Sequence, residues 1–517
     1  MSHADATIAD EPVAQAAARA GGTTTSPTGL DLTAPPGNES RVAARPSDKL
    51  PRETLTLLTV LLVGAFVVIL NETAMNVALA SIMTDLRVDE RAAQWLTTGF
   101  MLTMAVVIPT TGWLLQRLST RAAFVMAMSL FSLGTLTCAL AFSFPLLLGG
   151  RIIQASGTAI MMPLLMTTVM DLVPPHMRGR VMGTISLVIA VAPAIGPTVS
   201  GIVLQFLPWR FVFVVVLPIA LTILGLGIRF VRNIESGREV TLDGLSIPLA
   251  ALGFGGLVYG LSLVGNSVAP PWELGSVLTV GALSLAAFGW RQLRLQRTDS
   301  ALLDLRTFTI RNFAISAVVM GIVMLALFGS VIALPLLLQK ALHLDPLSVG
   351  LLMLPGGILM GLMGPVVGRL YDVVGPRWLL IPGGAVVTGA FALFATVTPA
   401  TPWWQLMVAN LLLSLGFAFM MTPLFTTALG SLPHSLRSYG SATVGTIQQV
   451  AGAAGTALFV TIMSTVSATA GGTPEAALAT GARAAFLAVG GIWVLGVVAS
   501  AFVGRVEDEH PAGAPVH

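Results

Sequence analysis

Charged side chains are scarce in this sequence, where they make up only 10% of 517 residues. An ordinary soluble domain carries roughly 25% charged residues. Hydrophobic residues reach 55%, and the mean hydropathy is +0.86. This composition excludes a soluble protein with a charged surface, and it predicts an integral membrane protein surrounded by a lipid bilayer.

Cysteine and histidine, the usual metal ligands, are also rare. The single cysteine, Cys138, lies inside an apolar stretch, which excludes a disulfide framework and a cysteine metal site. The six histidines fall in predicted tails or loops without metal-ligand spacing. There is no phosphate-binding Gly-x-x-x-x-Gly-Lys loop. We therefore expect no metal, no cofactor, no use of ATP and no enzymatic activity, and the net charge of +3 gives no reason to expect nucleic-acid binding.

Long apolar segments fill the rest of the chain. A tail at 1–50, rich in Ala, Pro, Thr, Ser and Gly, has no apolar run and is predicted to be disordered. The apolar segments that follow it are 54–83, 92–115, 122–141, 144–170, 179–206, 209–230, 244–264, 272–292, 311–338, 346–371, 377–397, 403–429, 440–466 and 483–504. A helix of about 20 residues crosses a bilayer, so the sequence predicts an all-α protein with fourteen transmembrane helices.

Basic residues are distributed unequally between the two sides of these segments. Of the 27 lysines and arginines, 21 fall in the tails and the even-numbered loops, and only five fall in the odd-numbered loops. Positive loops stay in the cytoplasm, so both termini are expected there. The Ala-, Gly- and Arg-rich usage, with only two lysines, suggests a bacterial cytoplasmic membrane.

The chain contains an internal repeat. The stretch 112–121 recurs at 368–377, an offset of 256, and 167–174 recurs at 426–433, an offset of 259. Repeats of this kind are typical of transporters whose substrate site lies near the midplane between two halves. The predicted organisation is a six-helix bundle at 51–232, a two-helix insertion at 233–300, a second six-helix bundle at 301–504 and a C-terminal tail at 505–517. The insertion has no role that the sequence reveals.

Glu72 is the only acidic residue well inside an apolar segment. A carboxylate there costs about 2.5–3.5 kcal/mol on insertion scales, so such groups usually face a cavity and mark an ion or proton path. Asn76 lies one turn further on the same face. Glu72 could instead be a structural group that a neighbouring helix satisfies.

Polar residues and methionines near the midplane are candidates to line a substrate cavity. They are Asn71, Met75, Asn76, Gln154, Met161, Asn410 and Gln448. Methionines adapt to varied ligands, although ordinary core packing explains them equally well.

The repeated loop resembles a motif of the major facilitator superfamily, Gly-x-Leu-x-Asp-Arg-x-Gly-Arg-Arg/Lys. The residues that carry the resemblance are Gly112, Leu114, Arg117 and Arg121 in the first copy and Gly368, Leu370, Asp372, Gly375 and Arg377 in the second. A carboxylate and arginines at a helix end can form a latch between the two halves. Gln116 replaces the acid in the first copy, which predicts a weaker latch there; an ordinary basic loop is the alternative.

Over residues 54–504 the chain is similar to the fourteen-helix drug:proton antiporters of that superfamily. Arg151 and Gln154 match their Arg-x-x-Gln-Gly motif, and Arg151 is the only basic residue inside a span of either half. The resemblance implies that Arg151 modulates the protonation of Glu72, with a purely structural role as the alternative. Asn410 occupies the repeat position of Arg151.

Two further stretches resemble the same family. Pro193, Gly196, Pro197 and Gly201 partly match its antiporter signature, which implies antiport rather than symport, although generic small-residue packing is the alternative. In the first span the family has Leu-Asp-x-Thr. This chain has Asn71 at the Asp position and its acid one residue later, about 100° round the helix, similar to a lincomycin-exporter-like branch.

The sequence thus predicts a proton-driven efflux antiporter for amphipathic organic compounds such as drugs, dyes or antibiotics. Its expected partners are these small substrates, protons and lipid, and it is expected to be a monomer. A dedicated exporter of a single metabolite, self-made antibiotic or lipid is the main alternative. A membrane sensor that does not transport is a third hypothesis.

Overall fold

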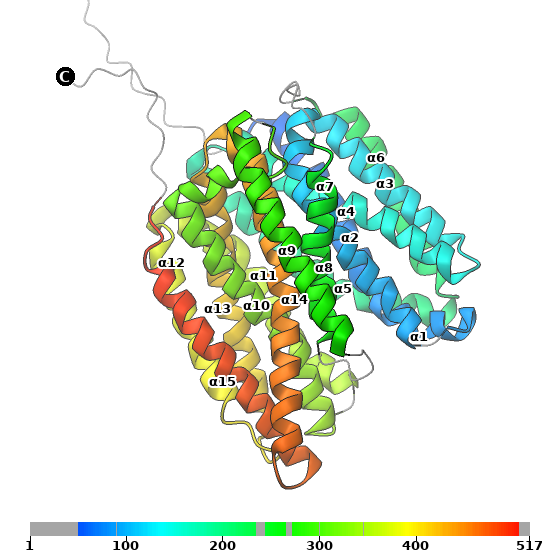
Figure 1. Ribbon diagram of the computed structural model, residues 1–517, viewed down its shortest axis with the longest axis vertical. Helices are drawn as coiled ribbons and strands as arrows, with labels where there is room; N and C mark the ends of the chain where they lie inside the picture. The colour runs from blue at the N-terminus through cyan, green and yellow to red at the C-terminus, as the bar shows by residue number, and fades with distance from the viewer. Residues whose placement is uncertain are drawn as a thin grey trace, which may run out of the picture. The chain divides into compact units, whose positions relative to one another are not determined.

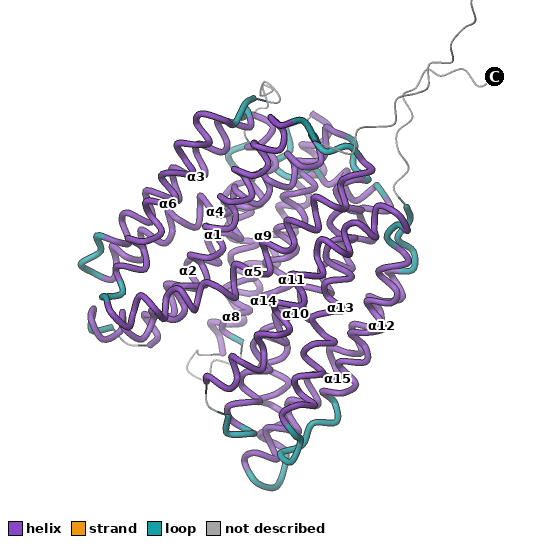
Figure 2. Tube along the Cα trace, turned by 180° about the vertical axis from the view of Figure 1, so that it is seen from behind, coloured by secondary structure: helices purple, strands orange, loops and turns teal. Residues whose placement is uncertain are grey.

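The computed structural model describes residues 50–88, 90–233, 243–264, 271–298, 300–344 and 346–505. Side chains at 76, 80, 90, 91, 94, 193, 194, 197, 271, 346 and 347 are outside this description. Within these ranges the chain is helical and contains no strand (Figure 2). The tails predicted at 1–50 and 505–517 lie almost entirely outside the described residues.

The first six helices form the N-terminal bundle, coloured from blue to blue-green in Figure 1. They are α1 (Arg52–Leu86), α2 (Glu90–Arg117), α3 (Thr120–Ala139), α4 (Phe144–Leu172), α5 (Pro175–Phe206) and α6 (Arg210–Phe230). Helices α3 and α4 cross closely because glycines leave room. A Cβ atom at Gly157 would collide with the Ala127 carbonyl, and one at Gly134 with the Gln154 backbone.

The last six helices form the C-terminal bundle. They are α10 (Arg311–Lys340), α11 (Pro346–Val374), α12 (Arg377–Phe394), α13 (Trp403–Gly430), α14 (Arg437–Thr469) and α15 (Pro474–Ser500). Its interior is aromatic: Phe394 stacks on Phe486 at 4.5 Å, and Trp493 packs edge-on against Phe417. The Trp493 indole donates to the Gly384 carbonyl at 3.1 Å, so the buried ring has a polar partner.

Short-range chemistry sets several helix ends. The Ser119 hydroxyl accepts from the Ala122 N–H and caps α3, and Thr473 caps α15 in the same way. Helix α11 ends at Val374 and is followed by Gly375, whose φ of 81° is the left-handed conformation that favours glycine. This glycine belongs to the second copy of the loop motif, so its place there follows from backbone geometry.

The predicted spans agree with the observed helices. Thirteen helical segments of the described residues are long and apolar enough to cross a membrane. The remaining predicted segment, 179–206, coincides with the 32-residue helix α5. An all-α membrane fold of two six-helix bundles with two inserted helices is therefore confirmed.

The inserted helices lie against α2 and reach α14. The first is continuous through α7 (Ser246–Ala250), the π-turn η1 (Ala251–Gly255) and α8 (Gly256–Leu263), and the second is α9 (Pro271–Leu295). Gly255 faces Leu102 of α2, and Tyr259 stacks on Trp95 at 5.5 Å.

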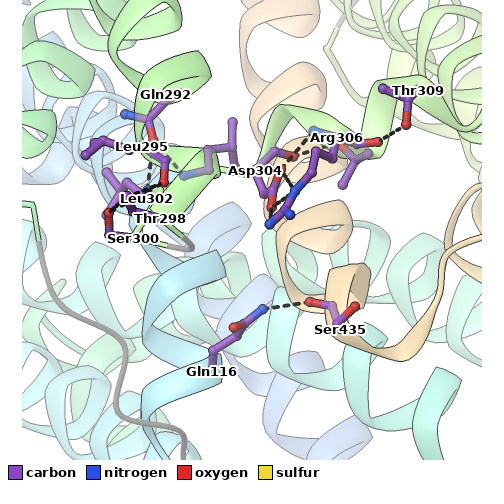
Figure 3. A network of polar contacts seen from close by, with 12 residues as sticks. Gln116, Gln292, Leu295, Thr298, Ser300, Leu302, Asp304, Arg306, Thr309 and Ser435 are labelled. Carbon is purple, nitrogen blue, oxygen red and sulfur yellow. Dashed lines mark hydrogen bonds and ion pairs between the residues drawn. The ribbon is translucent and has the colours of Figure 1, made fainter.

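A folded connection joins the insertion to the C-terminal bundle. It contains the short 3-10 turns η2 (Gln296–Thr298) and η3 (Leu305–Thr309). The buried Gln292 side chain accepts the N–H of Leu302 (Figure 3). It also accepts the N–H of Leu303. Leu302 and Leu303 pack in one apolar cluster with Ala442 of α14. The insertion thus contacts both bundles where α2 and α14 meet.

Candidate functional site

The polar stretch of α1 presents two neighbouring side chains to different surroundings. Asn71 is fully buried, whereas Glu72 is partly exposed. Successive residues of a helix point about 100° apart. Asn71 therefore faces the interior of the N-terminal bundle, and the carboxylate of Glu72 points away from that contact.

Arg151 of α4 lies at the centre of a buried polar chain. Its Nη1 donates to Gln154 Oε1 at 2.6 Å and to Asn71 Oδ1 at 3.5 Å. Gln154 in turn donates to the Thr135 hydroxyl at 2.7 Å. The guanidinium also lies over the Phe100 ring, 4.1 Å from its centroid. The network ties α1, α3 and α4 together around one buried charge.

Glu72 is the carboxylate near this charge, although the two do not form an ion pair within the described residues. They interact electrostatically through space, and Arg151 also interacts with the Cys138 thiol of α3. A carboxylate beside a buried cation, in an otherwise apolar helix, can take up and release a proton without leaving the membrane interior. That Arg151 modulates the protonation of Glu72 stays a prediction.

The antiporter-like segment of α5 packs directly on the Glu72 segment. A Cβ atom at Gly196 would collide with the Thr73 hydroxyl and approach the Leu70 carbonyl. Gly201 has nothing within 4 Å of the corresponding position. The side chains of Pro193 and Pro197 lie outside the described residues. Gly196 thus brings α5 against α1 at the residue next to Glu72.

The other residues predicted to line a cavity have mixed surroundings. Met75 and Met161 are buried in packed cores, and Met161 presses on Gly64. Asn410 donates to the Met353 carbonyl at 3.4 Å, and Gln448 approaches the Met324 sulfur at 3.8 Å. The Asn76 side chain lies outside the described residues. For this set, a role in binding substrate stays a prediction.

Asp372 of α11 joins the two bundles through the backbone of α5. Its carboxylate accepts the N–H of Gly179 at 2.8 Å and that of Arg180 at 2.9 Å. Gly179 and Arg180 are the fifth and sixth residues of α5, near the helix end that carries partial positive charge. Gly179 and Gly368 face each other so closely that a Cβ on either would collide with the other backbone. The expected pairing of Asp372 with the arginines of its own motif is therefore not observed, because this close crossing brings a helix start nearer.

The first copy of the motif makes a different contact. Gln116 of α2 donates to the Ser435 carbonyl at 2.8 Å, across to the C-terminal bundle (Figure 3). Gly112 packs against Tyr439 of α14. Arg117 lies over the Trp113 ring at 5.7 Å. Arg121 and Arg377 lie in the first turns of α3 and α12 and are exposed, and no ion pair of either is found in the described part of the chain.

The sequence analysis did not single out an ion pair between the bundles that lies near Gln116. Arg437, the first residue of α14, donates to Asp171 at the end of α4 at 2.9 Å, and both side chains are only 14% exposed. His434 lies 3.4 Å from the same carboxylate. The internal repeat could have indicated this pair. At the offset of 259, Arg178 matches Arg437, whereas Asp171 matches Gly430, so the acid is present in only one half.

Two more hydrogen bonds connect the N-terminal and C-terminal bundles. The hydroxyls of Ser186 and Thr422 share a hydrogen bond of 2.9 Å, and Ser441 donates to the Pro163 carbonyl at 3.2 Å. Pro163 and Thr422 are repeat partners at the offset of 259. The polar contacts described between the bundles lie at mid-depth or nearer the end where α1 begins and α15 ends. We call these contacts the gate: Asp372 with Gly179 and Arg180, Gln116 with Ser435, Asp171 with Arg437, Ser186 with Thr422, and Ser441 with Pro163.

Comparison with known proteins places this arrangement in one family. The family model described as "Major Facilitator Superfamily" matches residues 61–456. The MFS-type transporter YcnB of Bacillus subtilis is 40% identical over 455 residues, 87% of this chain and 95% of that protein. The lincomycin resistance protein LmrB of Bacillus subtilis is 38% identical over 471 residues, 89% of this chain and 97% of that protein.

A solved structure has the same fold at low sequence identity. The crystal structure of the human organic anion transporter MFSD10 superposes with a TM-score of 0.64 at 16% identity. The likeness covers 87% of this chain and all of that one. It supports the architecture of two bundles and carries no information on substrate.

Proposed function

This chain belongs to the major facilitator superfamily and is a multi-pass membrane transporter rather than an enzyme, and from that premise we propose that it exports amphipathic organic compounds in exchange for protons. Glu72 is the proposed proton carrier. The relative named for lincomycin resistance supports antibiotics or similar compounds as substrates.

The single observation that carries this proposal is the position of Glu72. It is the acidic residue inside the first apolar span, partly exposed, and within electrostatic reach of the buried Arg151. A carboxylate in a membrane span is retained against a cost of about 2.5–3.5 kcal/mol. Reversible protonation would explain why the acid is retained. The neutral form of Glu72 favours an apolar environment and the charged form a polar one, so the protonation state can be linked to the conformation.

The charge distribution supports an orientation for this conformation. The helix ends nearest the gate also carry most of the arginines, and under the positive-inside rule this supports a cytoplasmic location for the gate. In this orientation the described conformation is closed toward the cytoplasm, and Glu72 would take its proton from outside.

Alternating access then requires the gate to break. Hydrogen bonds to a charged group contribute about 1.5–3 kcal/mol each, so the contacts of Asp372 and of Asp171 oppose opening by a few kcal/mol. Protons and substrate must offset this free energy by binding the closed-gate and open-gate conformations with different affinities.

The proposal is tested by ethidium transport into inverted membrane vesicles, comparing the wild type with Glu72→Gln and Glu72→Asp. We expect Glu72→Gln to lose proton-driven transport by roughly tenfold or more and Glu72→Asp to keep part of it. A proton uncoupler should stop the wild type. Normal transport by Glu72→Gln, still blocked by the uncoupler, would place the proton site elsewhere. A wild type that moves no ethidium would instead favour a dedicated exporter of one metabolite, antibiotic or lipid.

A further inference from the structure

The side chain of Asn71 is only half satisfied, although it is fully buried. Its Oδ1 accepts a long hydrogen bond of 3.5 Å from Arg151, and its Nδ2 has no partner in the described structure. A buried donor without a partner is destabilising. Arg151 has the same deficiency, because its Nε is also a buried donor without an acceptor.

A carboxylate in the place of Asn71 would satisfy this contact better. An aspartate has nearly the same shape, leaves no orphan donor and would form a charge-assisted pair with the guanidinium. The chain instead has the neutral amide at 71, and its carboxylate on the next residue, outside hydrogen-bonding contact with Arg151. The locally less stable choice leaves the charge of Arg151 uncompensated by any bonded anion.

Few groups compete for that charge. Among the described residues, the titratable groups that interact with Arg151 are Glu72 on α1 and Cys138 on α3. Its hydrogen-bond partner on its own helix, Gln154, is neutral, and so is Thr135 of α3, which accepts from Gln154. Cys138 is a thiol, which is ordinarily neutral at pH 7, so Glu72 is the one of the two whose anionic charge Arg151 can act on.

We propose that Asn71 is a positioning residue whose neutral amide holds the Arg151 guanidinium beside Glu72 without neutralising it, so that this charge acts on Glu72. The inference rests on the proposed role of Glu72 as proton carrier. It explains why moving the acid by one residue is compatible with proton coupling: the partner of the arginine and the proton carrier are separate side chains here.

Asn71→Asp tests this directly. A carboxylate at 71 would take up the charge of Arg151 and add a like charge beside Glu72, so protonation of Glu72 should persist to a pH higher by about one unit. Asn71→Ala removes the acceptor without adding charge. It should lower the transport rate but leave the pH dependence of Glu72 protonation nearly unchanged.

Infrared titration of the purified protein reads the protonated carboxyl band without any substrate. The band that the wild type has and Glu72→Gln lacks belongs to Glu72. In Asn71→Asp the same band is isolated against Asn71→Asp/Glu72→Gln, which contains the added aspartate alone. An unchanged or lower midpoint in Asn71→Asp, or an equal shift in Asn71→Ala, would overturn the inference.

The double variant also decides the case in which Asn71→Asp does not accumulate. It keeps the net charge of the wild type, with its acid directly on Arg151. We expect it to accumulate normally and to show no proton-linked ethidium transport, whereas wild-type transport would refute the role of Asn71. If Glu72→Gln alone retains proton-linked transport, the proposed function fails, independently of the Asn71 results.

Discussion

Gln116 and Asp372 occupy the same position in the two copies of the loop motif, yet they bond to opposite kinds of backbone group. Asp372 accepts two N–H groups at the start of α5, whereas Gln116 donates to the Ser435 carbonyl just before α14. The first copy has no acid at this position. Near it, the anion of the gate is Asp171 at the end of α4, which accepts a hydrogen bond from Arg437. The gate therefore keeps one carboxylate on each side, supplied by different helices.

Asp372→Asn should weaken the gate. The amide loses the charge that the start of α5 stabilises, and we expect the closed form to lose about 1.5–3 kcal/mol, roughly tenfold or more in the equilibrium. Thr426→Cys in a Cys138→Ser background serves as reporter, because Thr426 is buried beside Asp372. Its labelling by an impermeant maleimide in inverted vesicles should accelerate. Asp85→Asn, which disrupts a pair with Arg210 inside one bundle, is the control and should change nothing.

Restoring the family acid by Gln116→Asp should harm the protein when made alone. Gln116 and Asp171 line the same small cavity, of about 60 Å³, so a second carboxylate there would repel the first. Asp171→Asn alone leaves Arg437 without its counter-charge. The double variant moves the single carboxylate from position 171 to the loop-motif position, where the second copy has Asp372, and it should recover part of the loss.

The measurement for this cycle is maleimide labelling of Thr168→Cys, which lines the same cavity. We expect a coupling energy of about 0.5–3 kcal/mol between positions 116 and 171. Strictly additive effects of the two substitutions would show that the two side chains do not share one electrostatic site.

Gly196→Ala and Gly201→Ala should behave differently although both belong to the antiporter-like segment. The added methyl at 196 collides with Thr73, and the one at 201 meets open space. We expect Gly196→Ala to reduce ethidium transport by roughly tenfold, since a small displacement beside the reacting group is costly, and Gly201→Ala to match the wild type. Equal losses from both would show that the segment acts by something other than its contact with α1.

The insertion should have an acid-sensitive anchor outside its spans. Asp243 forms two 2.6 Å hydrogen bonds with Arg291, which, together with Ser246, hold the pKa of the carboxyl down to about 2. Because this pKa lies below its ordinary value of about 3.9, the pair stabilises the fold fully above that pH and loses its contribution as the pH falls toward 2.

Asp243→Asn should therefore lower the thermal unfolding midpoint at pH 7, by an amount equivalent to about 1–3 kcal/mol. The difference from the wild type should shrink when the measurement is repeated at about pH 3. The exposed pair of Glu53 and Arg232 gives the matched control, and Glu53→Gln should leave the midpoint unchanged at both values. A constant difference at pH 7 and pH 3 would show that Asp243 acts through packing.

Much of the architecture follows from patterns that are local in the chain. Apolar length predicts each span, since a bilayer requires it, and the repeat at offsets of 256 and 259 predicts two related bundles. Glu72 and Arg151 stand out because a charge inside an apolar segment is costly wherever the helix lies. An interaction between them could be predicted for the same reason, because a cation and a carboxylate inside the membrane stabilise each other.

Other relationships depend on how helices rotate and cross. The sequence alone could not show that Asp372 would meet the N–H groups of a helix 193 residues away rather than its own arginines. It also did not show that Arg151 would bond Asn71 while Glu72 points elsewhere, or that the insertion would lie on α2 and α14.

The sequence by itself thus determined that this protein is a membrane transporter of two repeated bundles with one acid and one arginine inside the spans of the first bundle. The tertiary structure decided which of those polar groups touch. The physical reason is that lipid and helix interior are both apolar, so hydropathy hardly distinguishes the faces of a membrane helix. Contacts such as Gly179 with Gly368 and Gly196 with Thr73 then fix the rotation of each helix, and with it the partner of every polar side chain.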